Sequence, residues 1–356
     1  GATDPFVRNA KHLILEVNCA LPFGLFGIHD IYTASSNPIP LQKAGDRIGT
    51  AYIPCDFSKV EAIVLTDDLG KFPIFKAPDD VSRAIADRIV HFLKGEIAAG
   101  RQPPCLAPLQ SGVGSVANAV LAGLGNSGLS NLSMYTEVVQ DSALDLIESG
   151  KMTVASTTAV SLSQEAAKKF YGNIEYYKDK IIIRPQEISN HPELIRRLNL
   201  ISMNTPIECD IYGNVNSTHI MGVEMMNGIG GSGDFARNAG LTIFATGSLA
   251  KSGKISCIVP MCSHIDHTEH DVQVIVTEQG LADLRWKAPL ERANLIIERC
   301  AHPDYRPMLR EYLRVARSKG GHTPHDLEHA LSWHINYLSC GSMKQAAKIS
   351  GKFQQS

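Results

Sequence analysis

Glu137 is the residue whose place in the sequence first suggests contact with a ligand. It stands in "NLSMYTEVVQDSALDLIESGK", residues 131–151, between a strand-like alternation and a helix that we expect to end at Gly150. In an α/β protein, the turn from strand to helix lies at the sheet edge where side chains meet ligands. The alternative is that Glu137 is only a first-turn carboxylate favoured by the helix dipole.

Two glycines precede another expected helix in "LAPLQSGVGSVANAVLAGLG". Gly112 and Gly114 let backbone amides come close to a phosphate or a carboxylate. The segment lacks the third glycine of the dinucleotide fingerprint and the lysine of a P-loop, so a tight structural turn explains it equally well.

The segment from residue 184 to residue 240 is unusually polar and rich in glycine. Taken singly, its residues suit turns and helix caps, and Asn190 before "HP" can cap a helix. Taken together, they suggest a pocket of amides that suits an oxyanion. The residues concerned are Asn190, Glu208, Asp210, Asn214, Asn216, His219, Gly228, Gly230, Gly231 and Gly233.

The histidines of "HIDHTEH" recur at three-residue intervals, which would align His264, His267 and His270 if the segment were helical. Known zinc sites rarely use this spacing alone, and the next residues, "DVQVIV", are typical of a strand. We therefore expect no metal site.

The elements that must position these residues alternate between strands and helices. "LILEV" and "EAIVL" resemble buried strands, and no internal repeat is evident. The clearest helix follows Asp79 or Asp80 as its cap and stops at Gly100. Its expected apolar face comprises Val81, Ile85, Ile89, Phe92, Leu93 and Ile97. We place a domain boundary just before this helix, in "GKFPIFKAP".

Composition limits the possible partners. The chain has 356 residues, 44% hydrophobic and 20% charged, with a formal net charge of -2. It has no long charged run and no apolar run near the roughly 18–20 residues of a membrane span. We therefore expect small-molecule partners, and neither nucleic acid nor membrane. The eight scattered cysteines include no CxxC pair, which favours free thiols in a reducing compartment.

Several long motifs resemble the acetyl-CoA hydrolase/transferase family, the class I coenzyme A transferases that include acetate:succinate CoA-transferase. The resemblance runs from "LILEVN" to "CAHPDYRP", nearly the whole chain. The motifs are "YTEVVQDSALDLIESGK", "EISNHPELIRRLNLISMNT", "DIYGNVNSTH", "NGIGGSGDFARNAG", "HTEHDVQVIVTEQGLADLR" and "CAHPDYRPML".

The resemblance implies a role for each candidate residue. The family's nucleophilic glutamate corresponds to Glu137, and its oxyanion donors correspond to the Asn190 side chain and the Gly231 backbone N–H. Glu278 in "VTEQGLADL" corresponds to a second glutamate near the substrate, although an ion pair would also explain it. The remaining candidate contacts to substrate or CoA are Gly112, Val113, Gly114 and Gly230.

The implied reaction moves coenzyme A between a short acyl-CoA and a carboxylate acceptor, such as acetate or succinate, through a glutamyl-CoA thioester. CoA is a substrate, and we expect no cofactor. Three rivals remain: hydrolysis by the same intermediate, CoA binding without turnover, and, less favoured, nicotinamide-dependent oxidoreduction, for which the full glycine fingerprint is missing.

The resemblance also implies the architecture. We expect two open α/β CoA-transferase domains, residues 1–75 and 76–356, of which the first begins partway through its sheet because family members are longer at the N-terminus. We expect a homodimer, in the mitochondrial matrix if eukaryotic and otherwise in the cytoplasm. Trp286 stands where the family usually has glycine, and we expect its bulk to reshape the pocket near Glu278.

Overall fold

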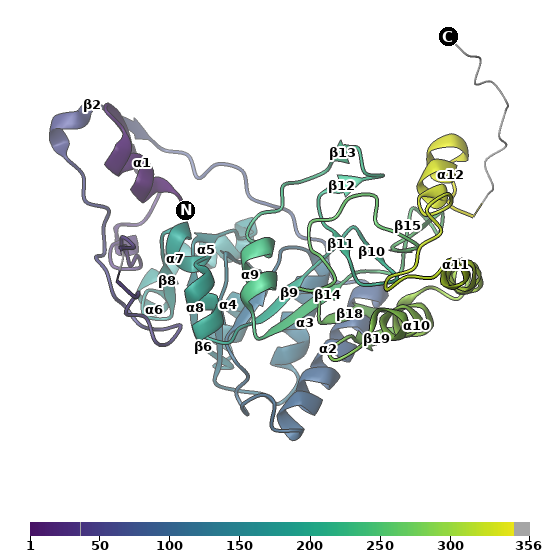
Figure 1. Ribbon diagram of the computed structural model, residues 1–356. Helices are drawn as coiled ribbons and strands as arrows, with labels where there is room; N and C mark the ends of the chain where they lie inside the picture. Colours follow the sequence, from purple (N-terminus) through teal and green to yellow (C-terminus); the bar gives the residue numbers. More distant parts are fainter. Residues whose placement is uncertain (36, 345–356) are drawn as a thin grey trace, which may run out of the picture. The chain divides into compact units, whose positions relative to one another are not determined.

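The structure is a computed structural model that describes residues 1–35 and 37–344. The chain forms two compact units, whose elements are labelled in Figure 1. The first unit consists of Gly1–Asn204 and Asp234–Thr242. The second consists of Thr205–Gly233 and Ile243–Ser356, of which the structure describes residues up to 344. The predicted boundary after residue 75 falls within the first unit and stays a prediction.

A parallel sheet organises the first unit. Its strands are largely buried, as expected of strands covered on both faces, although most of them include polar residues. In spatial order they are β9 (Ile201–Asn204), β3 (Leu109–Ser111), β4 (Leu132–Tyr135), β6 (Met152–Thr157) and β8 (Ile181–Ile183). The predicted α/β class is confirmed.

Helices connect these strands, and α2 packs beside α3, which in turn packs beside α4. The predicted helix after Asp79 is confirmed: the Asp79 side chain accepts a hydrogen bond from the Ser82 N–H, and Gly100 follows the helix with φ +69°. Ile85, Ile89 and Leu93 are fully buried, but Val81 is 38% exposed because it lies in the first turn, so its predicted burial is wrong. The helices are α1 (Thr3–Asn9), α2 (Asp80–Ala98), α3 (Ser115–Gly125), α4 (Asp141–Glu148), α5 (Gln164–Gly172), α6 (Ile174–Tyr177), α7 (Gln186–Ser189) and α8 (Pro192–Arg197).

The strand, turn and helix predicted around Glu137 are also confirmed. β4 ends at Tyr135, and α4 is followed by Gly150, whose φ of +70° suits a residue without a side chain. Between them, the short strand β5 (Val138–Val139) pairs in parallel with β7 (Ala159–Val160).

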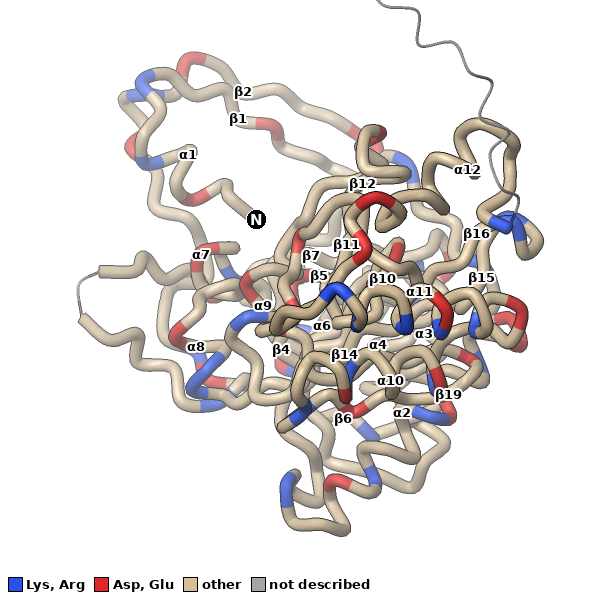
Figure 2. The backbone as a smooth tube through the Cα atoms, turned by 45° about the vertical axis from the view of Figure 1, so that its right-hand side comes forward, with Lys and Arg blue, Asp and Glu red and all other residues tan. Residues whose placement is uncertain are grey.

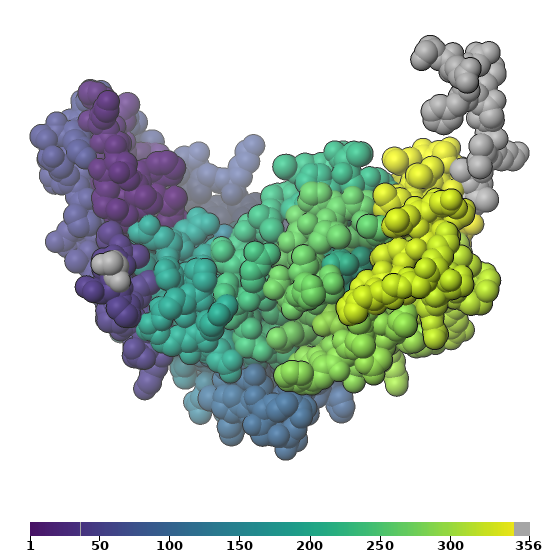
Figure 3. Space-filling model, in the orientation of Figure 1, coloured from purple at the N-terminus to yellow at the C-terminus, as the bar shows by residue number. Residues whose placement is uncertain are grey.

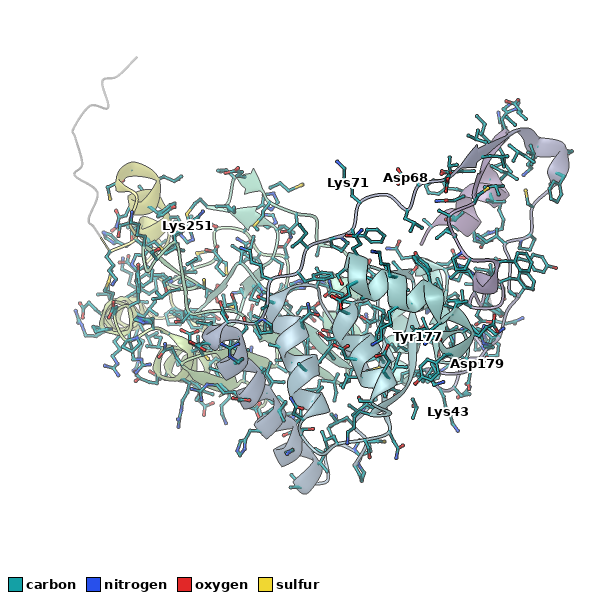
Figure 4. The ribbon with its side chains drawn as sticks, turned by 180° about the vertical axis from the view of Figure 1, so that it is seen from behind. Lys43, Asp68, Lys71, Tyr177, Asp179 and Lys251 are labelled. Carbon is teal, nitrogen blue, oxygen red and sulfur yellow. The ribbon has the colours of Figure 1, made fainter. Side chains whose placement is uncertain are left out.

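The two runs predicted as buried strands form a separate two-stranded parallel sheet. "LILEV" lies in β1 (Leu13–Asn18) and "EAIVL" in β2 (Val60–Thr66). Ile14, Ile63 and Leu65 are 59–70% exposed, so the predicted burial is wrong: no layer of the described residues covers them. Two short 3-10 helices, Phe23–Leu25 and Phe57–Lys59, lie between these strands in the chain. In Figure 4, Asp68 and Lys71 point outward from the segment that follows β2.

The second unit contains short strands and three helices among its described residues. β14 pairs in parallel with β18, and β18 pairs antiparallel with β19. The C-terminal part of the described chain, which includes α12, forms part of the surface and is yellow in Figure 3. The elements are β10 (Glu208–Asp210), β11 (Val215–Asn216), β12 (His219–Ile220), β13 (Glu224–Met225), β14 (Leu241–Ala245), β15 (Leu249–Ala250), β16 (Ile255–Ser256), β17 (Ile258–Val259), β18 (Val274–Thr277), β19 (Gly280–Asp283), α10 (Pro289–Cys300), α11 (Arg306–Ser318) and α12 (Ser332–Cys340). The chain passes between the units within α9 (Ser232–Asn238) and β14.

Charged residues of both signs are interspersed along the described backbone in Figure 2. No described helix combines the length and the apolar character that crossing a membrane requires.

All eight cysteines are free; Cys209, Cys257, Cys262 and Cys300 are buried, whereas Cys19 and Cys340 are exposed.

Candidate active site

Glu137 lies at a bend between β4 and β5 and is partly buried. The adjacent segment of the same chain bends at the same place, between β6 and β7. Tyr135 therefore pairs with Ser156 before the bend, and Val138 pairs with Ala159 after it. The two paired bends put Glu137 at the carboxyl end of a central strand of a parallel sheet. This is the edge at which such sheets bind ligands.

The backbone carbonyl of Glu137 accepts three hydrogen bonds from the opposite bend. The Thr157 hydroxyl donates at 2.9 Å, and the backbone N–H groups of Thr158 and Ala159 each donate at 3.1 Å. The backbone at Glu137 is therefore fixed independently of its carboxylate.

The loop with Gly112, Val113 and Gly114 lies beside Glu137 within the first unit. Thr136, which precedes Glu137, donates from Oγ1 to the Ser111 carbonyl at 3.1 Å and accepts from the Ser111 N–H at 3.4 Å. Gly114, whose φ of +119° requires glycine, donates from its N–H to Gln140 Oε1 at 3.4 Å. The sequence separation hides this proximity, but adjacent parallel strands create it.

Two contacts place Gly112 close against the neighbouring strand β9. The Gly112 N–H donates to the Met203 carbonyl at 2.8 Å, and a Cβ at Gly112 would lie 3.3 Å from Asn204 Oδ1. The side chain of Asn204 is itself fixed by hydrogen bonds with Gln110 and Ser202. The loop therefore rests on a buried polar network.

Asn190 follows α7, also in the first unit. The buried hydroxyl of Tyr135 donates to the Ile188 carbonyl at 2.6 Å and so ties the strand before Glu137 to the helix before Asn190. Asn190, His191 and Asp234 line a cavity of about 370 Å³.

Asn190 is buried, with only 6% of the residue's surface exposed. Desolvation raises the pKa of Asp234, and the nearby amide of Asn190 opposes that shift. Neither Nδ2 nor Oδ1 of Asn190, however, makes a hydrogen bond of normal geometry with a described residue. A buried amide without full partners costs free energy, which a ligand oxyanion would recover at Nδ2.

Gly230 and Gly231 lie in the second unit, in the loop before α9. Gly230 has φ +57°, and Gly231 is buried. The Ser232 hydroxyl lies 2.8 Å from the Ile229 carbonyl, to which it donates, and 3.2 Å from His267 Nε2. These contacts fix the carbonyl of Ile229, which directly precedes the two glycines.

Glu278 is also in the second unit, in the turn after β18. Its carboxylate accepts hydrogen bonds from the Ser248 N–H at 2.8 Å, from the Ser248 hydroxyl and from Gln279 Nε2 at 2.9 Å. Burial raises the pKa of Glu278, but these hydrogen bonds outweigh it and hold the pKa below its ordinary value. Glu278 therefore remains an anion at neutral pH.

The candidates thus form one group in each unit. The first unit holds Glu137, Asn190 and the loop of residues 112–114, and it brings the loop beside Glu137. The second holds Gly230, Gly231 and Glu278. The sequence did not single out Tyr135, Thr136, Gln140, Thr157 or Ser248, because their roles depend on strand pairing. Threonines at the ends of β4 and β6 were the available signal.

The histidine spacing does not produce a metal centre in the described structure. The segment with His264, His267 and His270 is a series of turns and bends, so the helical alignment does not arise. Among residues 1–35 and 37–344, the one group whose ligand atoms converge is Asp326, Glu328 and His329. It is largely exposed, and Lys319 pairs with Asp326.

Trp286 does not reshape a pocket beside Glu278. Its residue surface is 97% exposed, so the indole has too little contact to line a pocket, and this expectation is wrong. Its φ of +61° is instead the conformation that glycine adopts readily.

Comparison with known proteins identifies the family. Residues 167–313 match the acetyl-CoA hydrolase/transferase C-terminal domain. Succinyl-CoA:acetate CoA-transferase from Clostridium kluyveri is 57% identical over 97% of this chain and 65% of its own length. Acetyl-CoA hydrolase from Schizosaccharomyces pombe is 47% identical over 97% of this chain and 68% of its own length. The chain thus spans about two thirds of the length of these relatives.

Solved structures agree on the fold. RipA from Yersinia pestis superposes with a TM-score of 0.67 at 27% identity, covering 88% of this chain and 65% of RipA. A 4-hydroxybutyrate CoA-transferase from Porphyromonas gingivalis shares the fold, with a TM-score of 0.60 at 23% identity. The match covers 87% of this chain and 67% of that transferase's chain. The sequence relatives, with the matching family model, show that the chain belongs to the acetyl-CoA hydrolase/transferase family.

Proposed function

We propose that this protein is a CoA-transferase that moves coenzyme A between a short-chain acyl-CoA and a carboxylate such as acetate or succinate. The observation that carries the proposal is the position of Glu137, a partly buried carboxylate at the carboxyl end of a central strand, with its backbone fixed and a glycine loop beside it. Family membership and the names of the relatives support the choice of reaction.

A carboxylate nucleophile explains how CoA itself is transferred. Glu137 attacks the thioester carbonyl of the acyl-CoA, the C–S bond breaks, and a mixed anhydride and CoA thiolate result. The thiolate then attacks the glutamyl carbonyl, releases the donor carboxylate and leaves a glutamyl-CoA thioester. The acceptor carboxylate attacks this thioester, and the returning thiolate takes the acceptor acyl group and frees Glu137.

Each attack passes through a tetrahedral oxyanion. In the proposal, Nδ2 of Asn190 and the Gly231 N–H donate hydrogen bonds to it, and losing one such donor typically costs about 3–4 kcal/mol. The buried, incompletely bonded amide of Asn190 supports its role. Gly112, Val113, Gly114 and Gly230 are proposed to contact the CoA thioester, and Glu278 the substrate.

Trapping of the covalent intermediate tests the proposal. The full-length protein is incubated with acetyl-CoA or succinyl-CoA without acceptor, reduced with borohydride and digested for peptide mass analysis. We expect reduction at Glu137, because a glutamyl thioester is reduced whereas an ordinary carboxylate is not. Asn190→Ala should slow adduct formation by about 100-fold or more. A labelled residue elsewhere, or none despite measurable transfer, would overturn the assignment.

Hydrolysis is the second candidate, because several relatives are named acetyl-CoA hydrolase. Water would then replace the acceptor carboxylate at the same glutamyl thioester. Measuring acyl-CoA consumption with and without added succinate or acetate separates the two. A transferase depends on the acceptor and shows parallel initial-rate lines for donor and acceptor. A hydrolase instead consumes acyl-CoA at the same rate whether or not succinate or acetate is added.

The assembly and the compartment are part of the same proposal. We propose a homodimer, which light scattering of the full-length protein would detect as twice the mass of one chain. In a eukaryote the proposed compartment is the mitochondrial matrix, and otherwise the cytoplasm. Imaging of the tagged full-length protein tests it.

A further inference from the structure

We propose that Thr157 is a positioning residue for Glu137: its buried hydroxyl fixes the backbone carbonyl of Glu137 and thereby sets where the carboxylate lies during each attack. This inference rests on the proposed function, because it assumes that Glu137 is the nucleophile. Thr157 does not itself touch the substrate in this account.

The bend at Glu137 brings three donors to one carbonyl oxygen. Tyr135 pairs with Ser156 on one side and Val138 with Ala159 on the other. Between these pairs, the Glu137 carbonyl receives the N–H groups of both Thr158 and Ala159 at 3.1 Å. A carbonyl oxygen has two lone pairs, so the 2.9 Å contact from Thr157 Oγ1 is a third donor at the same atom.

Thr157 is held rigidly enough to perform this role. It is the last residue of β6 and fully buried, it pairs with Ile183, and its carbonyl accepts the Arg184 N–H at 2.7 Å. The single proton of its hydroxyl is shared between the Glu137 carbonyl at 2.9 Å and the Ala159 carbonyl at 2.8 Å, and the hydroxyl oxygen accepts from the Ala159 N–H at 3.3 Å. One side chain therefore joins both bends at the nucleophile.

The proposed reaction gives this rigidity a purpose. The Glu137 carboxyl group must react several times from the same position. As a carboxylate it attacks the acyl-CoA, and as an anhydride and then a thioester it is attacked itself. Misplacement of a reacting group by about 1 Å can cost on the order of 100-fold in rate. A pinned carbonyl restricts the main-chain rotation that would move the side chain.

The test compares Thr157→Val with Thr157→Ser in the full-length protein. Valine nearly matches threonine in shape but lacks the hydroxyl, whereas serine keeps it. Valine leaves the Glu137 carbonyl with two N–H donors, and the Ala159 carbonyl, which also loses the hydroxyl, belongs to a partly exposed residue, so folding should persist. We expect Thr157→Val to lower kcat and the rate of glutamyl-CoA formation about 10- to 100-fold with KM nearly unchanged, and Thr157→Ser to stay within about 3-fold of wild type.

Thr153→Val is the matched control on the same strand. Thr153 Oγ1 donates to the Leu132 carbonyl at 3.1 Å, so this variant loses the same type of bond at the opposite end of β4. Its kcat should equal that of wild type. Thermal unfolding and near-UV circular dichroism verify folding of every variant. If Thr157→Val does not fold, Thr157→Cys replaces it, because a thiol is a weaker donor and should give an intermediate loss of kcat.

The outcomes separate this inference from the function on which it rests. If wild-type protein forms no adduct at Glu137, the proposed function fails and the positioning role fails with it. If wild type forms the adduct but Thr157→Val, or Thr157→Cys in its place, turns over as fast as Thr153→Val, only the positioning role is overturned. A fall in kcat that serine does not rescue also overturns it, because the hydroxyl is then not the cause.

Discussion

The hydroxyl of Tyr135 donates a 2.6 Å hydrogen bond to the carbonyl of Ile188, and both groups are buried. Burial raises the pKa of Tyr135, so its hydroxyl stays a donor at any ordinary pH. The bond joins the end of β4 to α7 within one apolar core cluster. Glu137 and Asn190 each stand two residues beyond this bond, which therefore helps to set their separation.

Tyr135→Phe should affect both stability and rate. Removing the hydroxyl leaves the Ile188 carbonyl without this donor, and we expect a loss of about 1–3 kcal/mol in the free energy of unfolding. We also expect a severalfold fall in kcat, because the two proposed groups become less well fixed. Urea unfolding and initial rates measure the two effects. Tyr171→Phe, on α5, is the control; a kcat loss equal to that control would contradict the link.

Glu137→Asp should keep the charge but shorten the side chain by one methylene. Because the backbone at Glu137 is fixed by three donors, it cannot move forward to compensate. We expect kcat to fall on the order of 100-fold, measured as transfer of CoA to succinate or acetate. Glu165→Asp, at an exposed position on α5, should be unaffected. Near-normal turnover of Glu137→Asp would remove Glu137 from the nucleophile role.

Glu208 should give the second unit a stability that depends on pH. Its buried carboxylate accepts from Asn216 and Ser263 and pairs with His334 on α12 at 2.8 Å. Burial raises the pKa of Glu208, but the contacts with His334, Asn216 and Ser263 outweigh it, so the pKa lies below the ordinary 4.5. A depressed carboxyl pKa contributes stability above pH 4.5 that is lost as pH falls through the folded value.

Glu208→Gln should therefore lower the free energy of unfolding by about 1–3 kcal/mol at pH 7. The difference from wild type should shrink below about pH 4.5, as Glu208 becomes protonated. Urea unfolding at several pH values measures this. Glu311→Gln, whose carboxylate pairs with Arg314 at the exposed surface, should leave the free energy of unfolding nearly unchanged, because solvent screens that pair. A difference for Glu208→Gln that is constant from pH 7 to pH 3 would contradict the assignment.

Trp286→Gly should stabilise the protein. A non-glycine residue in the left-handed region costs about 1–2 kcal/mol, and the exposed indole has little packing to lose. Part of this gain is offset because glycine makes the unfolded chain more flexible, so we expect a net gain of about 0.5–1 kcal/mol. Trp286→Ala keeps a Cβ and should bring no gain. A higher urea midpoint for alanine than for glycine would refute the explanation.

The sequence predicts local features of this fold better than contacts between distant segments. The helix after Asp79 and the strand and helix around Glu137 follow from periodicity and capping, which are properties of neighbouring residues. The exposure of β1 and β2 does not, because whether another layer covers a strand is not encoded in its apolar run. Val81 and Trp286 show the same limit for single side chains.

The candidate site shows a similar division. The resemblance to a family, rather than the residue pattern alone, assigned roles to Glu137, Asn190 and Gly231, and those roles stay predictions. The sequence did not identify Thr157 as a contact of Glu137, since 20 residues separate them and only the paired bends bring them together. Ser248 and Glu278 are 30 residues apart and equally unpredictable.

The buried cysteines have a consequence for a protein whose proposed reaction releases the thiolate of CoA. Burial raises the pKa of Cys209 and Cys262, and that of Cys257 to about 12. Exchange with a disulfide requires an accessible thiolate, which these side chains do not offer. Mixed disulfides with oxidised CoA should therefore form first at Cys19 and Cys340, the exposed thiols, and leave the interior of the second unit unmodified under oxidative stress.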